Sequence, residues 1–169
     1  THLSPEELHK LEEVQLTEKF AKLQKPKDAF LFCCYAGLRY SDFTHLTSEN
    51  IIEFHKEFWL IYKSVKTGTE VRLPLYLLFE GKGIHILHRY KNDLNSFFKL
   101  KDNSNLNKEL NVLAKLAGIS KHISFHTARH TNATLLIYNG ANITTVQKLL
   151  GHKSVKTTQV YASAPRMVA

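Results

Sequence analysis

The chain has 169 residues, a length that suits one domain able to bury a sizeable core without a disulfide or a metal. Its 23 Lys and Arg residues outnumber its 15 Asp and Glu residues, and this formal charge of +8 favours a polyanionic partner such as DNA, RNA or an anionic membrane. No apolar run approaches the roughly 18 residues of a membrane-spanning helix, and the first residues do not resemble a secretion signal, so we expect a cytoplasmic protein with no membrane segment.

The first fifty residues predict three helices. Ser4-Pro5-Glu6-Glu7 is typical of a helix start, with a serine cap, a proline in the first turn and a capping-box glutamate. A second helix opens at Pro26 and ends at Gly37, and it is apolar nearly all round, which indicates a central position. The adjacent pair Cys33-Cys34 lies in this apolar stretch and predicts buried free thiols. A short amphipathic helix follows through Phe43 and Leu46.

A β-hairpin is predicted next. Residues 58–62 and 71–75 are rich in β-formers or alternate in polarity, and Lys66-Thr67-Gly68-Thr69 between them is a turn signal. A third strand is expected near Ile51-Ile52, and Pro74 is expected to mark a strand end.

The rest of the chain predicts further helices. They span about 87–98, 106–117, 127–138 and 144–150, with a loop at 102–105 and a last helical piece that holds Tyr161. The expected fold is therefore mainly α with a small antiparallel β-sheet, of the α+β class, and residues 1–169 form a single domain.

Polar residues gather in three places in the C-terminal third, at 126–130, at 150–152 and at Tyr161, and the first of these can be interpreted by itself. His126 and Arg129 are three positions apart, so a helix presents them on one face, close to a positive N-terminus that attracts phosphate. A polar helix start with surface ion pairs is the ordinary alternative for such a pair. The spacing of His126 and His130 also suits zinc, but position 127 is Thr where a zincin has Glu, no third ligand is evident, and Arg129 would oppose a cation. We therefore expect no metal.

The joint spacing carries more information than any single motif. Arg129 is followed after 23 positions by His152 in Leu150-Gly151-His152, and Tyr161 follows 9 positions later. Together with Gly37-Leu38-Arg39-Tyr40-Ser41-Asp42 and the Lys66 hairpin, this order resembles the tyrosine recombinase (phage integrase) family. The segment 37–42 is most similar in style to integrases of bacterial conjugative transposons.

The resemblance implies phosphoryl transfer between DNA strands without ATP, a metal or another cofactor. Tyr161 would attack a backbone phosphate and form a 3′-phosphotyrosyl link. Arg39 and Arg129 would hold the non-bridging oxygens, and His152 would add a further donor.

Three further roles follow from the same resemblance. His126 would move the tyrosine proton or bind the phosphate, and Asp42 would orient Arg39. Lys66 would protonate the 5′-oxygen leaving group, with Lys63 as a competitor for this role.

The implied partner is double-stranded DNA, bound by a homotetramer on paired sites, with a monomer expected for the isolated fragment. We expect no counterpart of the family's N-terminal DNA-clamping domain in this chain, and DNA binding should then be weak and sensitive to salt. A type IB topoisomerase-like enzyme and a non-catalytic DNA-binding relative are the alternatives.

Overall fold

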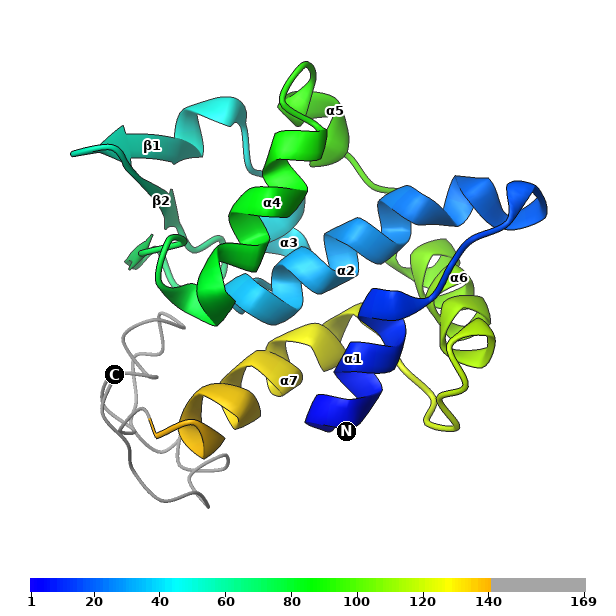
Figure 1. Cartoon of the computed structure of the whole chain (residues 1–169). Coiled ribbons are helices and arrows are strands. Elements are labelled where there is room, and N and C mark those ends of the chain that lie inside the picture. The colour runs from blue at the N-terminus through cyan, green and yellow to red at the C-terminus, as the bar shows by residue number, and fades with distance from the viewer. Residues whose placement is uncertain (141–169) are drawn as a thin grey trace.

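The computed structural model describes residues 1–140, and within them helices surround a small sheet (Figure 1). The helices are α1 (Pro5–Glu13), α2 (Gln24–Ala36), α3 (Tyr40–Thr44), α4 (Lys82–Arg89), α5 (Leu94–Phe97), α6 (Asn103–Leu116) and α7 (Phe125–Tyr138). Three 3₁₀ segments are η1 (Glu18–Leu23), η2 (Ser48–Asn50) and η3 (Leu78–Gly81), and the strands are β1 (Ile51–Phe54), β2 (Glu57–Lys63) and β3 (Glu70–Leu73). The α+β class predicted from the sequence is confirmed.

Helix α2 is the centre of the fold. Every residue from Pro26 to Ala36 is buried, and α7, α4 and α6 pack around it. Gly37 ends the helix in the left-handed conformation, with φ of 75°, which a side chain would disfavour. Cys33 and Cys34 are fully buried, and burial raises the pKa of both thiols. The central helix and its free thiols are thus as predicted.

An aromatic cluster fixes α3 against the core. Phe43 of α3 is fully buried, and four rings lie with centroids 5.4 to 6.1 Å from its own, mostly in edge-to-face or tilted contact. These rings belong to Phe32, Phe97, Phe98 and Phe125. These rings come from α2, α5, α7 and the residue after α5. Their packing around Phe43 therefore fixes the position of α3 relative to most of the core.

The three strands form an antiparallel sheet in the order β1-β2-β3. Leu60 pairs with Leu73 and Tyr62 with Val71, and all four side chains are buried on one face. Pro74 directly follows β3, because a proline has no N–H to donate to a ladder. The hairpin and the third strand predicted near Ile51 are confirmed.

The predicted helix at 87–98 is wrong, because the chain breaks there into α4 and α5. The Asp93 carboxylate accepts a hydrogen bond from the Ser96 N–H at 3.1 Å and so caps a new helix. The Tyr90 hydroxyl donates to buried Asp28 at 2.6 Å, which holds the break against α2. Side-chain capping therefore outweighed the apolar pattern.

Two helix starts also differ from the prediction. The expected loop at 102–105 belongs largely to α6, because the Asp102 carboxylate accepts from the Asn105 N–H at 3.0 Å and caps that helix. Helix α7 begins two residues before the predicted Thr127, because Ser124 and Thr127 form a capping box. The helix expected at 144–150 and the piece that holds Tyr161 lie outside the described residues.

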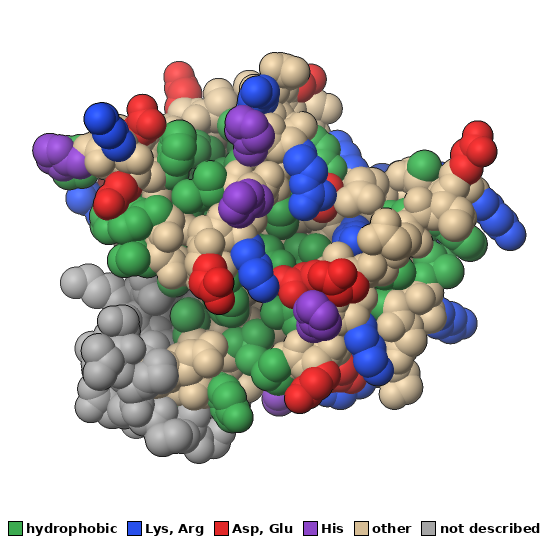
Figure 2. Space-filling model, in the orientation of Figure 1, with side chains coloured by type: hydrophobic (Ala, Val, Ile, Leu, Met, Phe, Trp, Pro, Cys, Tyr) green, Lys and Arg blue, Asp and Glu red, His purple; other side chains and the backbone are tan. Residues whose placement is uncertain are grey.

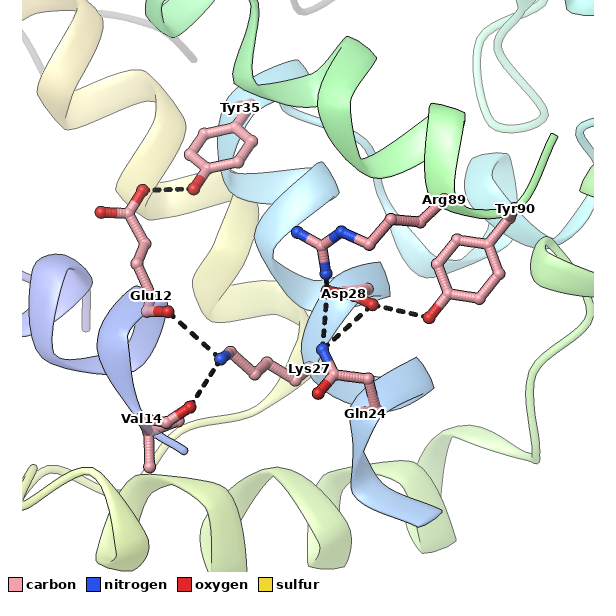
Figure 3. Close-up of polar contacts among 8 residues, drawn as sticks. All are labelled: Glu12, Val14, Gln24, Lys27, Asp28, Tyr35, Arg89 and Tyr90. Carbon is pink, nitrogen blue, oxygen red and sulfur yellow. Dashed lines mark hydrogen bonds and ion pairs between the residues drawn. The ribbon is translucent and has the colours of Figure 1, made fainter. Parts of the chain in front are cut away.

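Polar contacts tie α1 to the central helix (Figure 3). The largely buried Lys27 ammonium donates to the carbonyls of Glu12 and Val14, at 3.2 and 2.9 Å, and so caps the C-terminal end of α1. The Tyr35 hydroxyl donates to the Glu12 carboxylate, and Asp28 accepts from Gln24, Arg89 and Tyr90.

Within residues 1–140, no helix is long and apolar enough to cross a bilayer.

Replacing Phe43 by Ala is expected to lower the free energy of unfolding by about 3–5 kcal/mol, because it leaves a cavity among four rings. Urea denaturation followed by circular dichroism measures the loss. Val112 is 40% exposed on α6, and Val112→Ala serves as the control, with a change below about 0.5 kcal/mol. A loss below about 1 kcal/mol for Phe43→Ala would contradict the central role of this ring.

Candidate active site

Arg39 and Asp42 lie together at the start of α3. Arg39 is the N-terminal cap of this helix, and its side chain is 19% exposed, whereas that of Asp42 is 1% exposed. The Arg39 Nη1 lies 3.9 Å from the Asp42 Oδ2, which allows charge attraction but is too long for a hydrogen bond. Both atoms are buried and have no hydrogen-bond partner among the described residues. A largely buried guanidinium with one unpaired donor among the described residues is suited to bind an anion.

Arg129 reaches the same junction from α7. Its side chain is 4% exposed, and its Nη1 donates to the Gly37 carbonyl at 2.8 Å. Gly37 caps α2 and lies two positions before Arg39, so the two arginines meet at the connection between α2 and α3. The contact spans 92 positions of the chain.

His126 lies in the first turn of α7, among these cations. Partial burial lowers the pKa of its imidazole, the Arg129 and Arg39 charges lower it further, and Lys66 adds a smaller effect. Coulomb interactions weaken with distance, so positive charges on the segments that carry Arg39, Arg129 and Lys66 act on the His126 ring. The His130 ring contacts His126 edge to face, with centroids 4.4 Å apart.

The turn that carries Lys66 is fastened to α3. The Val65 N–H donates to the Asp42 Oδ1 at 2.8 Å, and the turn closes through the Gly68 N–H, which donates to the Ser64 carbonyl at 2.8 Å. Lys66 follows Val65 and its side chain is exposed. One buried carboxylate therefore faces Arg39 and anchors the backbone beside Lys66.

Lys63 lies on the same hairpin but on the exposed face of β2, opposite buried Tyr62. Tyr62 is buried, and its pKa is raised by burial and by Asp42, while Arg129 and Arg39 oppose this shift. The buried face of β2, which carries Leu60 and Tyr62, therefore points into the core. Successive side chains of a strand point to opposite faces, so Lys63, which is exposed, points the other way.

Five of the residues named from the sequence are thus brought together: Arg39, Asp42, Lys66, His126 and Arg129. His152 and Tyr161 lie outside the described residues. Two backbone groups that fix this site, the Gly37 carbonyl and the Val65 N–H, could not be predicted from the sequence, because nearly every residue type carries a carbonyl and an N–H. In the described part of the chain, no three His, Cys, Asp or Glu side chains are placed to hold a metal.

Asp42→Ala is expected to lower the free energy of unfolding by about 1–3 kcal/mol, because the Val65 N–H loses its acceptor. Hydrogen exchange should speed up at the Val65 amide and change little at the Ile61 amide within the sheet. Glu49→Ala, an exposed change in η2, is the control. Unchanged protection of the Val65 amide would show that the turn does not depend on this carboxylate.

Comparison with known proteins gives related sequences along nearly the whole chain. Tyrosine recombinase XerD of Oceanobacillus iheyensis is 32% identical over 176 residues, covering 94% of this chain and 56% of that protein. Tyrosine recombinase XerC of Rickettsia prowazekii is 35% identical over 134 residues, covering 75% of this chain and 43% of that protein. The chain therefore spans about half the length of these curated relatives.

Solved structures show the same fold. The crystal structure of XerA recombinase has a TM-score of 0.75 at 25% identity and covers 96% of this chain and 60% of its own. A lambda integrase dimer bound to a COC′ core site has a TM-score of 0.75 at 19% identity, covering 96% of this chain and 59% of its own. The Tn1549 transposon integrase, at 17% identity and TM-score 0.70, covers 96% of this chain and 61% of its own, and it shows a shared fold alone. The expected resemblance to conjugative-transposon integrases is thus a minor one.

The sequence pattern of the Phage integrase family matches residues 2–166. This match includes the stretch in which Arg39, Lys66, His126 and Arg129 gather, and the chain belongs to the Phage integrase family.

Proposed function

We propose that the chain is the catalytic domain of a site-specific DNA recombinase that cleaves and rejoins strands through a 3′-phosphotyrosyl intermediate. The observation that carries the proposal is the meeting of Arg39 and Arg129 at the α2–α3 junction, beside His126. Two guanidinium groups at one junction, one buried and one largely buried, repel each other, and a phosphodiester held between them would relieve this repulsion. Membership of a family that includes XerC and XerD supports the same activity.

In the proposed reaction, the Tyr161 hydroxyl oxygen attacks the phosphorus of the scissile linkage. A bond forms between this oxygen and phosphorus, and the bond from phosphorus to the 5′-oxygen breaks. A 5′-hydroxyl of a partner strand then attacks the phosphotyrosine, which restores a phosphodiester and frees Tyr161. The number of phosphoester bonds is constant, so no external energy source is needed.

The two arginines would stabilise the charge that spreads over the non-bridging oxygens. Preorganised donors of this kind contribute about 3–4 kcal/mol each in other enzymes. Arg39 and Arg129 are held by protein contacts on one side, by Asp42 and the Gly37 carbonyl respectively, which limits their motion before substrate binds. His152 would add a donor to the same phosphate.

His126 and Lys66 would handle the protons. The lowered pKa of His126 keeps its ring neutral near pH 7, so it can accept the Tyr161 proton or donate a hydrogen bond to the phosphate. Lys66 would protonate the leaving 5′-oxygen from the exposed turn anchored by Asp42. Asp42 would act as a positioning residue for both Arg39 and this turn.

The proposed partner is double-stranded DNA, in keeping with the lambda integrase structure, which is a dimer bound to a core site. We extend the proposal to a homotetramer on paired sites for the whole protein in the cytoplasm, and to a monomer for residues 1–169 alone as one catalytic domain. A net charge of +8 suits this partner.

Tyr161→Phe is expected to abolish covalent protein–DNA adduct on a nicked duplex that carries the recombination site, because phenylalanine has no oxygen to attack phosphorus. Denaturing gels with end-labelled DNA measure the adduct. Arg39→Ala should slow its formation by about 10²–10³-fold. Arg72→Ala, an exposed arginine of β3 paired with Glu70, is the matched control and should leave the rate within about twofold. Adduct that persists in Tyr161→Phe would disprove the assignment of the nucleophile.

Lys66→Ala and Lys63→Ala form a second matched pair. Loss of Lys66 should slow cleavage of an ordinary phosphodiester by about 10²–10⁴-fold, while loss of Lys63 should change it little. A substrate with sulfur at the 5′-bridging position needs no proton on its leaving group, so it should restore Lys66→Ala to near the wild-type rate. The reverse pattern, with sulfur restoring Lys63→Ala, would transfer the role to Lys63.

A further inference from the structure

A second cationic feature lies at the other end of α2. A cavity of about 200 Å³ is lined by four lysines, Lys22, Lys25, Lys99 and Lys101, over a floor that includes Leu100 and Leu106. We call it the lysine pocket. Lys22 and Lys25 lie in η1 and the first turn of α2, whereas Lys99 and Lys101 lie in the connection between α5 and α6, which passes beside this end of α2 (Figure 1).

The lysine pocket has a surplus of positive charge. Its lining includes one carboxylate, Glu109, which lies 3.2 Å from the Lys101 ammonium and is thus already paired. Lys22 and Lys99 are exposed, and no carboxylate of residues 1–140 lies within ion-pairing distance of either. Two ammonium groups at the rim are therefore available to an anion.

The pocket is also held in shape by Lys25. Its ammonium donates to the carbonyls of Ser96 and Lys99, both at 2.7 Å, and so fastens the α5–α6 connection to α2. Partial burial lowers the pKa of this lysine, with Asp93 opposing the shift. The surroundings differ on the face formed by α1, α2 and α4, where acidic and basic side chains alternate (Figure 2) and Lys82 and Arg89 have carboxylate partners.

One residue connects the pocket with the candidate active site. Tyr40 follows Arg39, and its hydroxyl donates to the Lys101 carbonyl at 2.6 Å. Its ring meets Phe125 edge to face, with centroids 5.8 Å apart, and Phe125 directly precedes His126. Tyr40 therefore connects the pocket with the two segments that carry Arg39 and His126.

We propose that the lysine pocket binds a DNA backbone phosphate other than the scissile one, and so helps to set the register of the strand over Tyr161. This inference rests on the proposed function, because it takes the ligand to be the DNA that is cleaved. A concave site with room for a phosphate group, two ammonium groups without a carboxylate partner in residues 1–140 and a third lysine bonded to two carbonyls suits a phosphodiester. Contacts of this kind position a duplex without reading its sequence.

The test compares two double variants of the 169-residue chain. Lys22→Ala/Lys99→Ala removes the free charges of the pocket and spares Lys25, which fastens the backbone. Lys10→Ala/Lys115→Ala removes the same charge from exposed lysines of α1 and α6 that do not line the pocket. DNA affinity is measured by fluorescence anisotropy from about 0.05 to 0.5 M salt, and phosphate-ethylation interference locates the contact.

The loss of one phosphate contact should reduce the slope of log K against log salt by about 0.9, which is roughly an eightfold loss of affinity at 0.1 M salt. Ethylation of one particular phosphate should weaken DNA binding by the wild-type chain and by the control variant, but not by the pocket variant. Equal slopes for both double variants, or an unchanged interference pattern, would overturn the proposal. Adduct formation by the wild-type chain is scored separately, so a failure of the pocket is distinguishable from a failure of the catalytic assignment.

Discussion

The carboxylate of Asp42 is almost fully buried, and its two oxygens face two different parts of the candidate site. One oxygen accepts the Val65 N–H, and the other lies near the Arg39 guanidinium. Burial of a charge is costly without partners, and here a cation and a backbone donor supply them. The hairpin turn and the start of α3 are thus joined through one side chain, which anchors the backbone directly before Lys66.

The burial of α2 supports this arrangement. Because α2 is enclosed by other helices, its C-terminal end at Gly37 is a fixed point, and the Gly37 carbonyl holds Arg129 there. Phe43 fixes the following helix within the aromatic cluster, so Arg39 has little freedom to move away. The packing of α2 and α3 in the core therefore holds both arginines at this junction.

Several cations gather at this junction with few compensating groups among the described residues. Arg39, Arg129 and Lys66 all lower the pKa of His126, and one Arg39 donor is buried without a hydrogen-bond partner in the described region. Strain of this electrostatic kind is typical of sites prepared for a charged ligand. The lysine pocket at the other end of α2, connected to the site through Tyr40, adds a second group of cations, and both groups suit the proposed DNA partner.

Much of the fold follows from local signals in the sequence. The start of α1 at Ser4, the end of α2 at Gly37 and the hairpin around Gly68 were all predictable, because capping groups and turn residues act over a few positions. The break between α4 and α5 was not, since Asp93 competes with an apolar pattern that continues across it, and Tyr90 is held by Asp28 some 62 positions away. Long-range hydrogen bonds of this kind leave no periodic trace in the sequence.

The sequence by itself determined the residue types of the site and their order along the chain, and these were enough to indicate the family. It also determined where most helices and strands lie, because these depend on neighbouring residues. Only the tertiary structure decided that Arg39 and Arg129 meet at the Gly37 carbonyl, that Asp42 anchors the turn before Lys66, and that Lys63 lies on the exposed face of β2. The physical reason is that each of these facts depends on backbone groups and packing between distant segments, which the identity of a residue does not encode.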